Sequence, residues 1–148
     1  MDVRPPFVAV LDDEARLRQA LVRLLRSHGV AAAPFAHGRE LLKALEGEAC
    51  ACVLLDLHMP EVTGFNVLAA LLERGSRVPV IVITGHDEPG TEERVRALGA
   101  ADYLLKPLDA AELLTALRRV ADPASRANPP CPSSAAPSAL PTNPSRQP

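Results

Sequence analysis

The sequence predicts an α/β domain: a doubly wound, five-stranded parallel sheet with helices on both faces. Two observations lead to this prediction. Short continuous apolar runs, typical of strands buried on both faces, alternate along the chain with segments whose apolar residues recur at helical spacing. Strand–helix units that follow one another in this way form right-handed crossovers, and right-handed crossovers give a parallel sheet.

The first half of the chain carries three expected strands, residues 7–11, 30–35 and 50–55. Between them, leucines recur at helical spacing: Leu17, Leu21, Leu24 and Leu25 in one helix and Leu41, Leu42 and Leu45 in the next. We expect the first helix to close at His28 and Gly29, because glycine readily adopts the left-handed conformation that ends many helices.

The second half carries two expected strands, residues 78–83 and 102–105, and the first of these is the most β-branched run of the chain. Residues 64–74 form a helix between the third and fourth strands. We expect Thr91 to cap a short helix that ends at Gly99. Asp109 and Glu112 resemble a capping box and open the last helix, whose buried face carries Leu113, Leu114, Leu117 and Val120.

Composition divides the 148 residues into two parts. Residues 5–121 are long enough to form one domain with a sizeable core. Residues 122–148 hold eight of the 15 prolines and are otherwise rich in serine and alanine. A segment of this kind buries too little apolar surface to offset its ordering entropy, so we expect a disordered tail.

Bulk properties exclude several classes of protein. The net charge of −2 gives no excess of positive charge to attract nucleic acid, so no direct nucleic acid binding is expected. No membrane association is expected either, since no run is long and apolar enough to span a bilayer and no leader pattern opens the chain. Cys50, Cys52 and Cys131 match no metal-ligand spacing. We interpret them as small apolar residues in the cytoplasm, with Cys50 and Cys52 on one face of a strand.

Polar residues follow four of the apolar runs. Asp12 and Asp13 follow the first, Asp56 the third, Thr84 the fourth and Lys106 the fifth. In open parallel sheets, ligands bind beyond the carboxyl ends of the strands, near the switch in strand order. We therefore expect these five side chains to converge on one edge of the sheet.

The chemistry that such an edge permits is narrow. Clustered carboxylates suit a hard cation such as Mg²⁺, which takes one or two carboxylates together with phosphate oxygens. Lys106 adds a compact positive charge, and Thr84 adds a hydroxyl that can bind an oxyanion. These are the components of phosphoryl transfer to an oxygen nucleophile, and a carboxylate nucleophile gives an acyl phosphate, here on Asp56.

At these residues the chain resembles the receiver domains of bacterial two-component response regulators, over residues 7–120. The motifs that carry the resemblance are Leu11-Asp12-Asp13-Glu14, Asp56-Leu57-His58-Met59-Pro60 with Gly64 beyond, Ile83-Thr84-Gly85, and Lys106-Pro107. Each motif alone is weak, and their order and spacing together are specific. The resemblance implies the flavodoxin-like strand order 2-1-3-4-5.

The resemblance also implies roles for individual residues. Asp56 would accept a phosphoryl group from the phosphohistidine of a sensor histidine kinase or a histidine phosphotransfer protein. Asp13 would bind Mg²⁺ directly and Asp12 through water, and the other protein ligands would be Asp56 and the main-chain carbonyl of His58. Thr84 and Lys106 would hold the phosphoryl oxygens, and the peptide bond between Lys106 and Pro107 would be cis.

Further expectations concern the switch and its output. In the family, movement of the residue at Thr84 is coupled to an inward turn of the aromatic at Tyr103, which remodels the face formed by the fourth helix, fifth strand and fifth helix. That face would bind a downstream protein partner or support a homodimer formed on phosphorylation. His58 and His86 occupy positions that flank the phosphorylated residue, so we expect them to set the lifetime of the acyl phosphate and its dependence on pH.

Plainer interpretations of the same residues stay open. An acidic pair after a strand often only caps a helix, so Asp13 or Glu14 could have that role. Thr84 could be a turn residue, Tyr103 a half-buried aromatic of the sheet, and the two histidines solvated side chains.

Three other functions also compete with a stand-alone switch. A pseudo-receiver would bind partners without phosphotransfer, although the complete set of site residues argues against it. A truncated transcriptional regulator would need a DNA-reading module that the sequence after residue 122 does not contain. An enzyme with a strand-end aspartyl nucleophile would usually carry a second aspartate where His58 stands, so we expect the chain to catalyse only its own phosphorylation and dephosphorylation.

Overall fold

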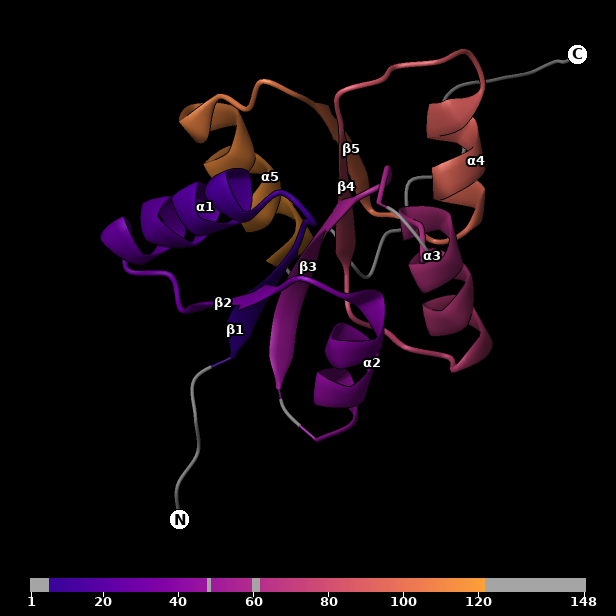
Figure 1. Cartoon of the computed structure of the whole chain (residues 1–148), viewed down its shortest axis with the longest axis horizontal. Coiled ribbons are helices and arrows are strands. Elements are labelled where there is room, and N and C mark those ends of the chain that lie inside the picture. The colour runs from indigo at the N-terminus through magenta and orange to yellow at the C-terminus, as the bar shows by residue number, and fades with distance from the viewer. Residues whose placement is uncertain (1–5, 48, 60–61, 122–148) are drawn as a thin grey trace, which may run out of the picture.

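The computed structural model of the protein describes residues 6–47, 49–59 and 62–121. Its elements are β1 (Phe7–Leu11), α1 (Ala15–Ser27), β2 (Ala32–Phe35), α2 (Gly38–Gly47), β3 (Cys50–Asp56), α3 (Gly64–Glu73), β4 (Val80–Thr84), α4 (Thr91–Ala97), β5 (Asp102–Leu105) and α5 (Ala110–Ala121). The strands pair in parallel in the order β2-β1-β3-β4-β5 (Figure 1), which confirms the predicted fold class and strand order. The predicted tail, residues 122–148 with Cys131, lies outside the described residues.

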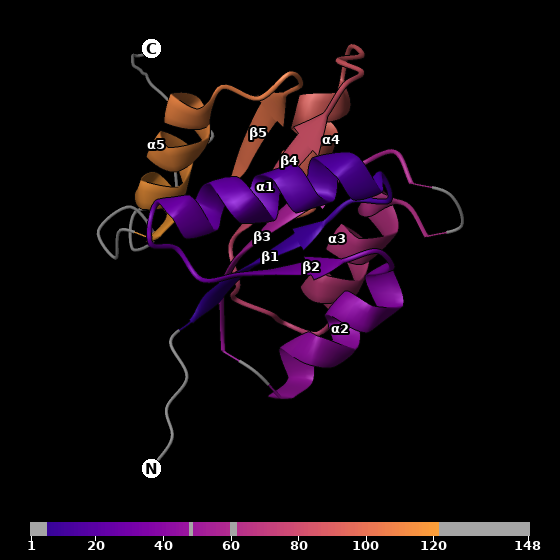
Figure 2. The same ribbon diagram turned by 60° about the vertical axis from the view of Figure 1, so that its left-hand side comes forward.

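The sheet separates two apolar layers. On one face, β1, β3, β4 and β5 pack against α1 and α5, whose buried side chains include Leu25 and Leu113. On the other face they pack against α2, α3 and α4, which contribute Leu41, Val67 and Val95. Figure 1 and Figure 2 both show α1 and α5 on one side of the sheet and α2 and α3 on the other. The doubly wound arrangement follows from this division of the helices.

Helix ends follow their capping chemistry. The main-chain N–H groups of Gly29 and Val30 donate to carbonyls in the last turn of α1, and Gly29 has a φ of 78°, so the predicted closure is confirmed. The carboxylate of Asp109 accepts from the N–H of Ala111 at the start of α5, as expected of a cap. The prediction that Thr91 caps α4 is wrong. Gly90 occupies the cap position with a φ of 85°, a conformation that threonine rarely adopts.

The prediction that Cys50 and Cys52 share a face of the sheet is also wrong. The β1–β3 register shifts between Phe7, which pairs with Cys50, and Val8, which pairs with Cys52. The irregularity leaves Ala51 as an extra residue in β3 and reverses the side-chain alternation there. Cys50 therefore packs in the layer of α2, α3 and α4, and Cys52 in the layer of α1 and α5. Burial raises the pKa of the Cys52 thiol to about 12, consistent with an apolar core residue.

Strand bounds differ slightly from prediction where they matter for the site. Asp56 and Thr84 are the last residues of β3 and β4 rather than the first residues after them. Hydrogen bonds from the N–H of Leu57 to Ile83 and from the N–H of Lys106 to Thr84 continue the ladder to the end of the sheet. The polar side chains are therefore held by the sheet itself. In the described part of the chain, no helix has the length and apolar character needed to cross a membrane.

Candidate functional site

The predicted site residues lie at the carboxyl ends of four strands, along one edge of the sheet. Asp12 follows β1, Asp56 ends β3, Thr84 ends β4 and Lys106 follows β5. The chain leaves β1 toward β2 on one side and later returns to β3 on the other, so the switch in strand order lies between β1 and β3. Asp12 and Asp56 stand at that switch, where open α/β sheets bind their ligands.

The carboxylates of Asp12, Asp13 and Asp56 form a compact cluster. Each offers an oxygen within 4.8 Å of the others. Asp12 and Asp56 are only 2 % and 5 % exposed, whereas Asp13 is exposed and borders a hollow of about 410 Å³ that Met59 and Val62 also line. Two buried carboxylates and one accessible carboxylate fit a hard divalent cation that keeps several of its waters, as Mg²⁺ does.

Lys106 faces both buried carboxylates. Its Nζ lies 3.4 Å from Oδ2 of Asp12 and 3.6 Å from Oδ1 of Asp56. The peptide bond between Lys106 and Pro107 is cis, as the resemblance implied. The ammonium group therefore neutralises part of a concentrated negative charge at the edge of the sheet.

The carboxyl group of Asp56 is harder to ionise than an ordinary aspartate. Its pKa rises from 3.8 to about 6, chiefly because the group is buried and also because the carboxylate of Asp12 lies beside it. Lys106 and the main-chain N–H of His58 oppose the rise. At neutral pH the carboxylate is ionised but under-compensated, so a positive ligand would be bound favourably.

Asp12 is anchored on three sides. Its Oδ1 accepts from the main-chain N–H of Glu14 at 2.9 Å, its Oδ2 faces Lys106, and its main-chain carbonyl accepts from Nη1 of Arg18 at 2.7 Å. Glu14, and not Asp13, occupies the N-cap position of α1, as the plainer interpretation allowed, but its side chain makes no hydrogen bond to the helix. Arg18 was not predicted, because nothing in its sequence context distinguishes it from the other arginines of α1.

Thr84 is wholly buried, and its hydroxyl group bonds within the loop between β4 and α4. Oγ1 accepts from the main-chain N–H of His86 at 3.0 Å and donates to the His86 carbonyl at 3.3 Å. This is the turn geometry of the plainer interpretation. The same hydroxyl lies at the carboxyl ends of the strands, beside β3. Thr84 is therefore placed both to bond within the turn and to bind an oxyanion.

The structure brings His58 and His86 together, which the sequence did not indicate. Their ring centroids lie 4.9 Å apart with the ring planes at 83° to each other. The main-chain N–H of His58 donates to Oδ1 of Asp56 over 3.4 Å. The role of the His58 carbonyl as a metal ligand stays a prediction.

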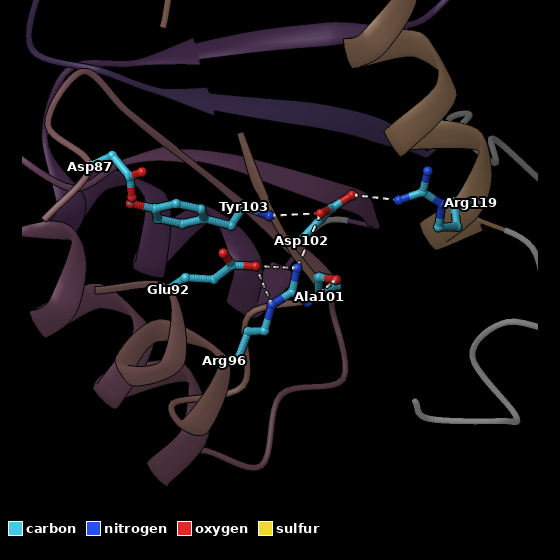
Figure 3. A network of polar contacts seen from close by, with 7 residues as sticks. All are labelled: Asp87, Glu92, Arg96, Ala101, Asp102, Tyr103 and Arg119. Carbon is cyan, nitrogen blue, oxygen red and sulfur yellow. Dashed lines mark hydrogen bonds and ion pairs between the residues drawn. The ribbon is translucent and has the colours of Figure 1, made fainter. Parts of the chain in front are cut away.

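Tyr103 is half-buried and bonded to the loop that follows Thr84. Its hydroxyl group donates to Oδ1 of Asp87 at 3.0 Å (Figure 3). Burial and the adjacent Asp87 raise the pKa of the phenol to about 12. The two predicted switch residues, Thr84 and Tyr103, are therefore both tied to the same loop, at His86 and Asp87.

A charged network joins α4, β5 and α5 around Asp102, which is 8 % exposed. Its carboxylate lies 3.0 Å from Nη1 of Arg119 on α5 and 3.5 Å from Nη2 of Arg96 on α4 (Figure 3). Arg96 also pairs with Glu92 one turn earlier in α4, at 3.0 Å. This network could not be predicted from the sequence, in which Asp102 is recognisable only as the start of an expected strand.

Two glycines shape the loops around Asp56. A Cβ at Gly64 would lie 2.7 Å from the main-chain carbonyl oxygen of Asp56 and from Cα of Leu57, so only glycine lets α3 begin this close to the end of β3. A Cβ at Gly85 would meet only Cδ of Lys106, at 3.9 Å. Gly64 is thus required by packing, whereas Gly85 leaves open space beside the lysine.

Comparisons with known proteins agree with this geometry. The family model described as the response regulator receiver domain matches residues 8–118. The response regulator protein TodT of Pseudomonas putida is 37 % identical over 119 residues, 80 % of this chain and 52 % of TodT. The transcriptional regulatory protein FixJ of Azorhizobium caulinodans is 36 % identical over 75 % of this chain and 53 % of its own length.

Solved structures show the same fold. A response regulator receiver protein from Burkholderia phymatum is 40 % identical with a TM-score of 0.70, over 79 % of this chain and 95 % of that one. The chain thus matches nearly all of a receiver structure, but it spans only about half the length of TodT and FixJ.

Proposed function

The chain belongs to the family of response regulator receiver domains, and on that basis we propose that it is a switch operated by phosphorylation of Asp56. The observation that carries the proposal is the placement of Asp56. This buried carboxylate lies beside Asp12 and Asp13 and within 3.6 Å of the ammonium group of Lys106. A nucleophile, a cation site and a charged group for phosphoryl oxygens thus occupy one edge of the sheet.

The phosphoryl donor in this proposal is the phosphohistidine of a sensor histidine kinase or of a histidine phosphotransfer protein. A carboxylate oxygen of Asp56 attacks phosphorus, the P–N bond breaks, and its electron pair returns to the imidazole of the donor. The product is an acyl phosphate on Asp56. With a pKa of about 6 the carboxyl group is ionised at neutral pH, which the attack requires.

Lys106 and Thr84 bind the phosphoryl oxygens. Asp13, Asp56 and the carbonyl of His58, with Asp12 through water, would hold Mg²⁺, which would supply positive charge for those oxygens. Lys106 moves from its two carboxylate partners toward the incoming group, and its charge remains inside the cluster. The hydroxyl group of Thr84 leaves the His86 carbonyl and donates to a phosphoryl oxygen instead.

The exchange of partners at Thr84 gives the switch its output. Breaking the bond between Thr84 and the His86 carbonyl removes one of the two hydrogen bonds that tie Thr84 to the loop, which also carries Asp87, the partner of Tyr103. Release of Tyr103 then remodels the surface formed by α4, β5 and α5. We propose that this surface binds a downstream protein partner or a second copy of the chain.

His58 and His86 modulate the lifetime of the acyl phosphate. Both rings are exposed beside Asp56 and restrict the approach of the hydrolytic water. Replacing either with alanine is expected to change the dephosphorylation rate, measured on purified phosphoprotein by loss of the phosphoryl mass. Unchanged lifetimes in both variants would contradict this role.

Incubation with Mg²⁺ and acetyl phosphate tests the function. Intact-mass spectrometry should show one added phosphoryl group in the parent and none in Asp56→Asn. Tyr103 is the one tyrosine of the chain and there is no tryptophan, so beryllofluoride with Mg²⁺ should change tyrosine fluorescence in the parent only. Absence of both signals would favour a pseudo-receiver that binds partners without phosphotransfer.

The activity of the whole protein is part of the proposal, because the chain spans about half the length of the curated relatives it matches. We propose that the described domain acts in the cytoplasm and catalyses only its own phosphorylation and dephosphorylation. A role in transcription is favoured only by the names of relatives such as FixJ. It would require an output domain beyond the described residues.

A further inference from the structure

His58 and His86 form a pair of accessible imidazoles at the carboxyl edge of the sheet. Their ring centroids are 4.9 Å apart, and the planes are nearly perpendicular at 83°. Both residues are exposed, so an ion can reach them from solvent. The chain contains four histidines, and within the described residues His58 and His86 are the two whose rings are in contact.

Main-chain hydrogen bonds fix the backbone positions of His58 and His86. His58 is tied to Asp56 through its N–H, and His86 is tied to Thr84 by two hydrogen bonds of 3.0 and 3.3 Å. Asp56 and Thr84 end the neighbouring strands β3 and β4, whose register is set by Asp56 opposite Ile83. The separation of the two residues is therefore a property of the sheet, and little ordering is needed to present both rings to one ligand.

The separation matches that of two imidazoles on one tetrahedral metal ion. Bonds of about 2 Å from the ion to each ring nitrogen, at a tetrahedral angle, place two imidazole centroids about 5 Å apart. The observed separation of 4.9 Å is close to this value, so we expect rotation of the rings about their side-chain torsions to direct one nitrogen of each toward a shared ion. Imidazole favours Zn²⁺, Ni²⁺ and Cu²⁺, whereas the neighbouring carboxylates favour Mg²⁺.

We propose that His58 and His86 bind a divalent transition-metal ion such as Cu²⁺ or Zn²⁺, with water in its remaining positions, at a site separate from that of Mg²⁺. A solvated edge-to-face contact without a ligand is the plain alternative. Because both residues lie two positions beyond a site residue, Asp56 or Thr84, a bound ion would also obstruct access to Asp56. That consequence rests on the proposed function, whereas metal binding does not.

Electron paramagnetic resonance of Cu²⁺ tests the site directly. The full chain is titrated with substoichiometric Cu²⁺ in excess Mg²⁺, so that the carboxylate cluster is occupied. The parent should show coupling to two imidazole nitrogens. His58→Ala and His86→Ala should each lose coupling to one nitrogen and bind Cu²⁺ at least about tenfold more weakly, a loss of at least about 1.4 kcal/mol.

The other two histidines give the matched control. A variant carrying His28→Ala and His37→Ala should keep the spectrum of the parent. A spectrum that survives in the variant carrying both His58→Ala and His86→Ala, or that is lost in the control, would overturn the site. A parent spectrum without nitrogen coupling would overturn it as well.

A second readout addresses access to Asp56. Zn²⁺ should slow the phosphorylation of Asp56 by acetyl phosphate and Mg²⁺ in the parent. In the variant carrying both His58→Ala and His86→Ala, the rate should be the same with and without Zn²⁺. Equal parent rates with and without Zn²⁺ would overturn the obstruction. If the parent is not labelled even without Zn²⁺, the proposed function fails, and the copper spectra still decide the metal site.

Discussion

Replacing Asp56 with asparagine is expected to stabilise the metal-free protein at neutral pH. In the folded protein, the pKa of this carboxyl group is about 6, against 3.8 for an ordinary aspartate, because the group is buried beside Asp12. Asparagine has nearly the same shape and carries no charge. The substitution therefore removes the cost of ionising the group and leaves most of its packing.

The magnitude follows from the difference between the two pKa values. At about 1.4 kcal/mol for each pKa unit, a rise from 3.8 to about 6 corresponds to about 3 kcal/mol. Between these two pKa values the folded protein holds a proton that the unfolded chain has released, so the free energy of unfolding falls as pH rises through this window. The advantage of Asp56→Asn should grow from about 1 kcal/mol near pH 4.5 to about 3 kcal/mol above pH 7.

Urea unfolding followed by circular dichroism, in buffer with a chelator, measures this difference at each pH. Glu73→Gln, which neutralises an exposed carboxylate at the end of α3, is the control and should change stability by less than about 0.5 kcal/mol. Added Mg²⁺ should stabilise the parent more than the variant, because the ion binds the folded carboxylate cluster. Equal stability of parent and Asp56→Asn at all pH values would refute the reasoning, as would an advantage that shrinks as pH rises.

Three further predictions concern the surroundings of the site. Gly64→Ala should destabilise the domain by about 1 to 3 kcal/mol in urea unfolding, because the new Cβ meets the main chain of Asp56 and Leu57. Ultraviolet absorbance of Tyr103 should titrate near pH 12, and Asp87→Asn should move its pKa down toward the ordinary value of 10, since only burial and the charges of Glu92 and Glu88 then remain to raise it. Asp102→Asn should lower the free energy of unfolding, measured in urea, by about 1 to 3 kcal/mol, because it leaves two arginines without their shared carboxylate.

Matched variants separate these effects from general damage. Gly47→Ala places a Cβ where nothing lies within 4 Å, so it should leave urea unfolding almost unchanged. Arg74→Gln removes an exposed ion pair with Glu46 and should cost less than about 1 kcal/mol. A loss in either control equal to that of its partner variant would contradict the packing and charge arguments, and an unshifted Tyr103 titration in Asp87→Asn would contradict the hydrogen bond.

The edge of the sheet could be predicted because each of its residues ends an apolar run. Asp56 and Lys106 are conspicuous as charges at the ends of buried segments, and the topology rules of parallel sheets place such ends together. Their convergence therefore needed no knowledge of individual contacts. The strand order came from the resemblance to receiver domains rather than from the residues.

Features set by contacts between distant elements could not be predicted. The opposite faces of Cys50 and Cys52 depend on a shift in the register between β1 and β3, which side-chain alternation along one strand does not contain. The bond between Tyr103 and Asp87 depends on the path of a loop. At α4 the error was local, since Gly90 and Thr91 are both acceptable caps and the backbone there adopts a positive φ.

Chemical trapping of the phosphorylated residue tests the central claim most directly. Borohydride reduces an aspartyl acyl phosphate to homoserine, so protein treated with acetyl phosphate and Mg²⁺, then with borohydride, can be digested and sequenced by tandem mass spectrometry. We predict homoserine at position 56 in the parent, and aspartate there when Mg²⁺ is replaced by a chelator. Homoserine at position 12 or 13, or none in the parent, would contradict the account.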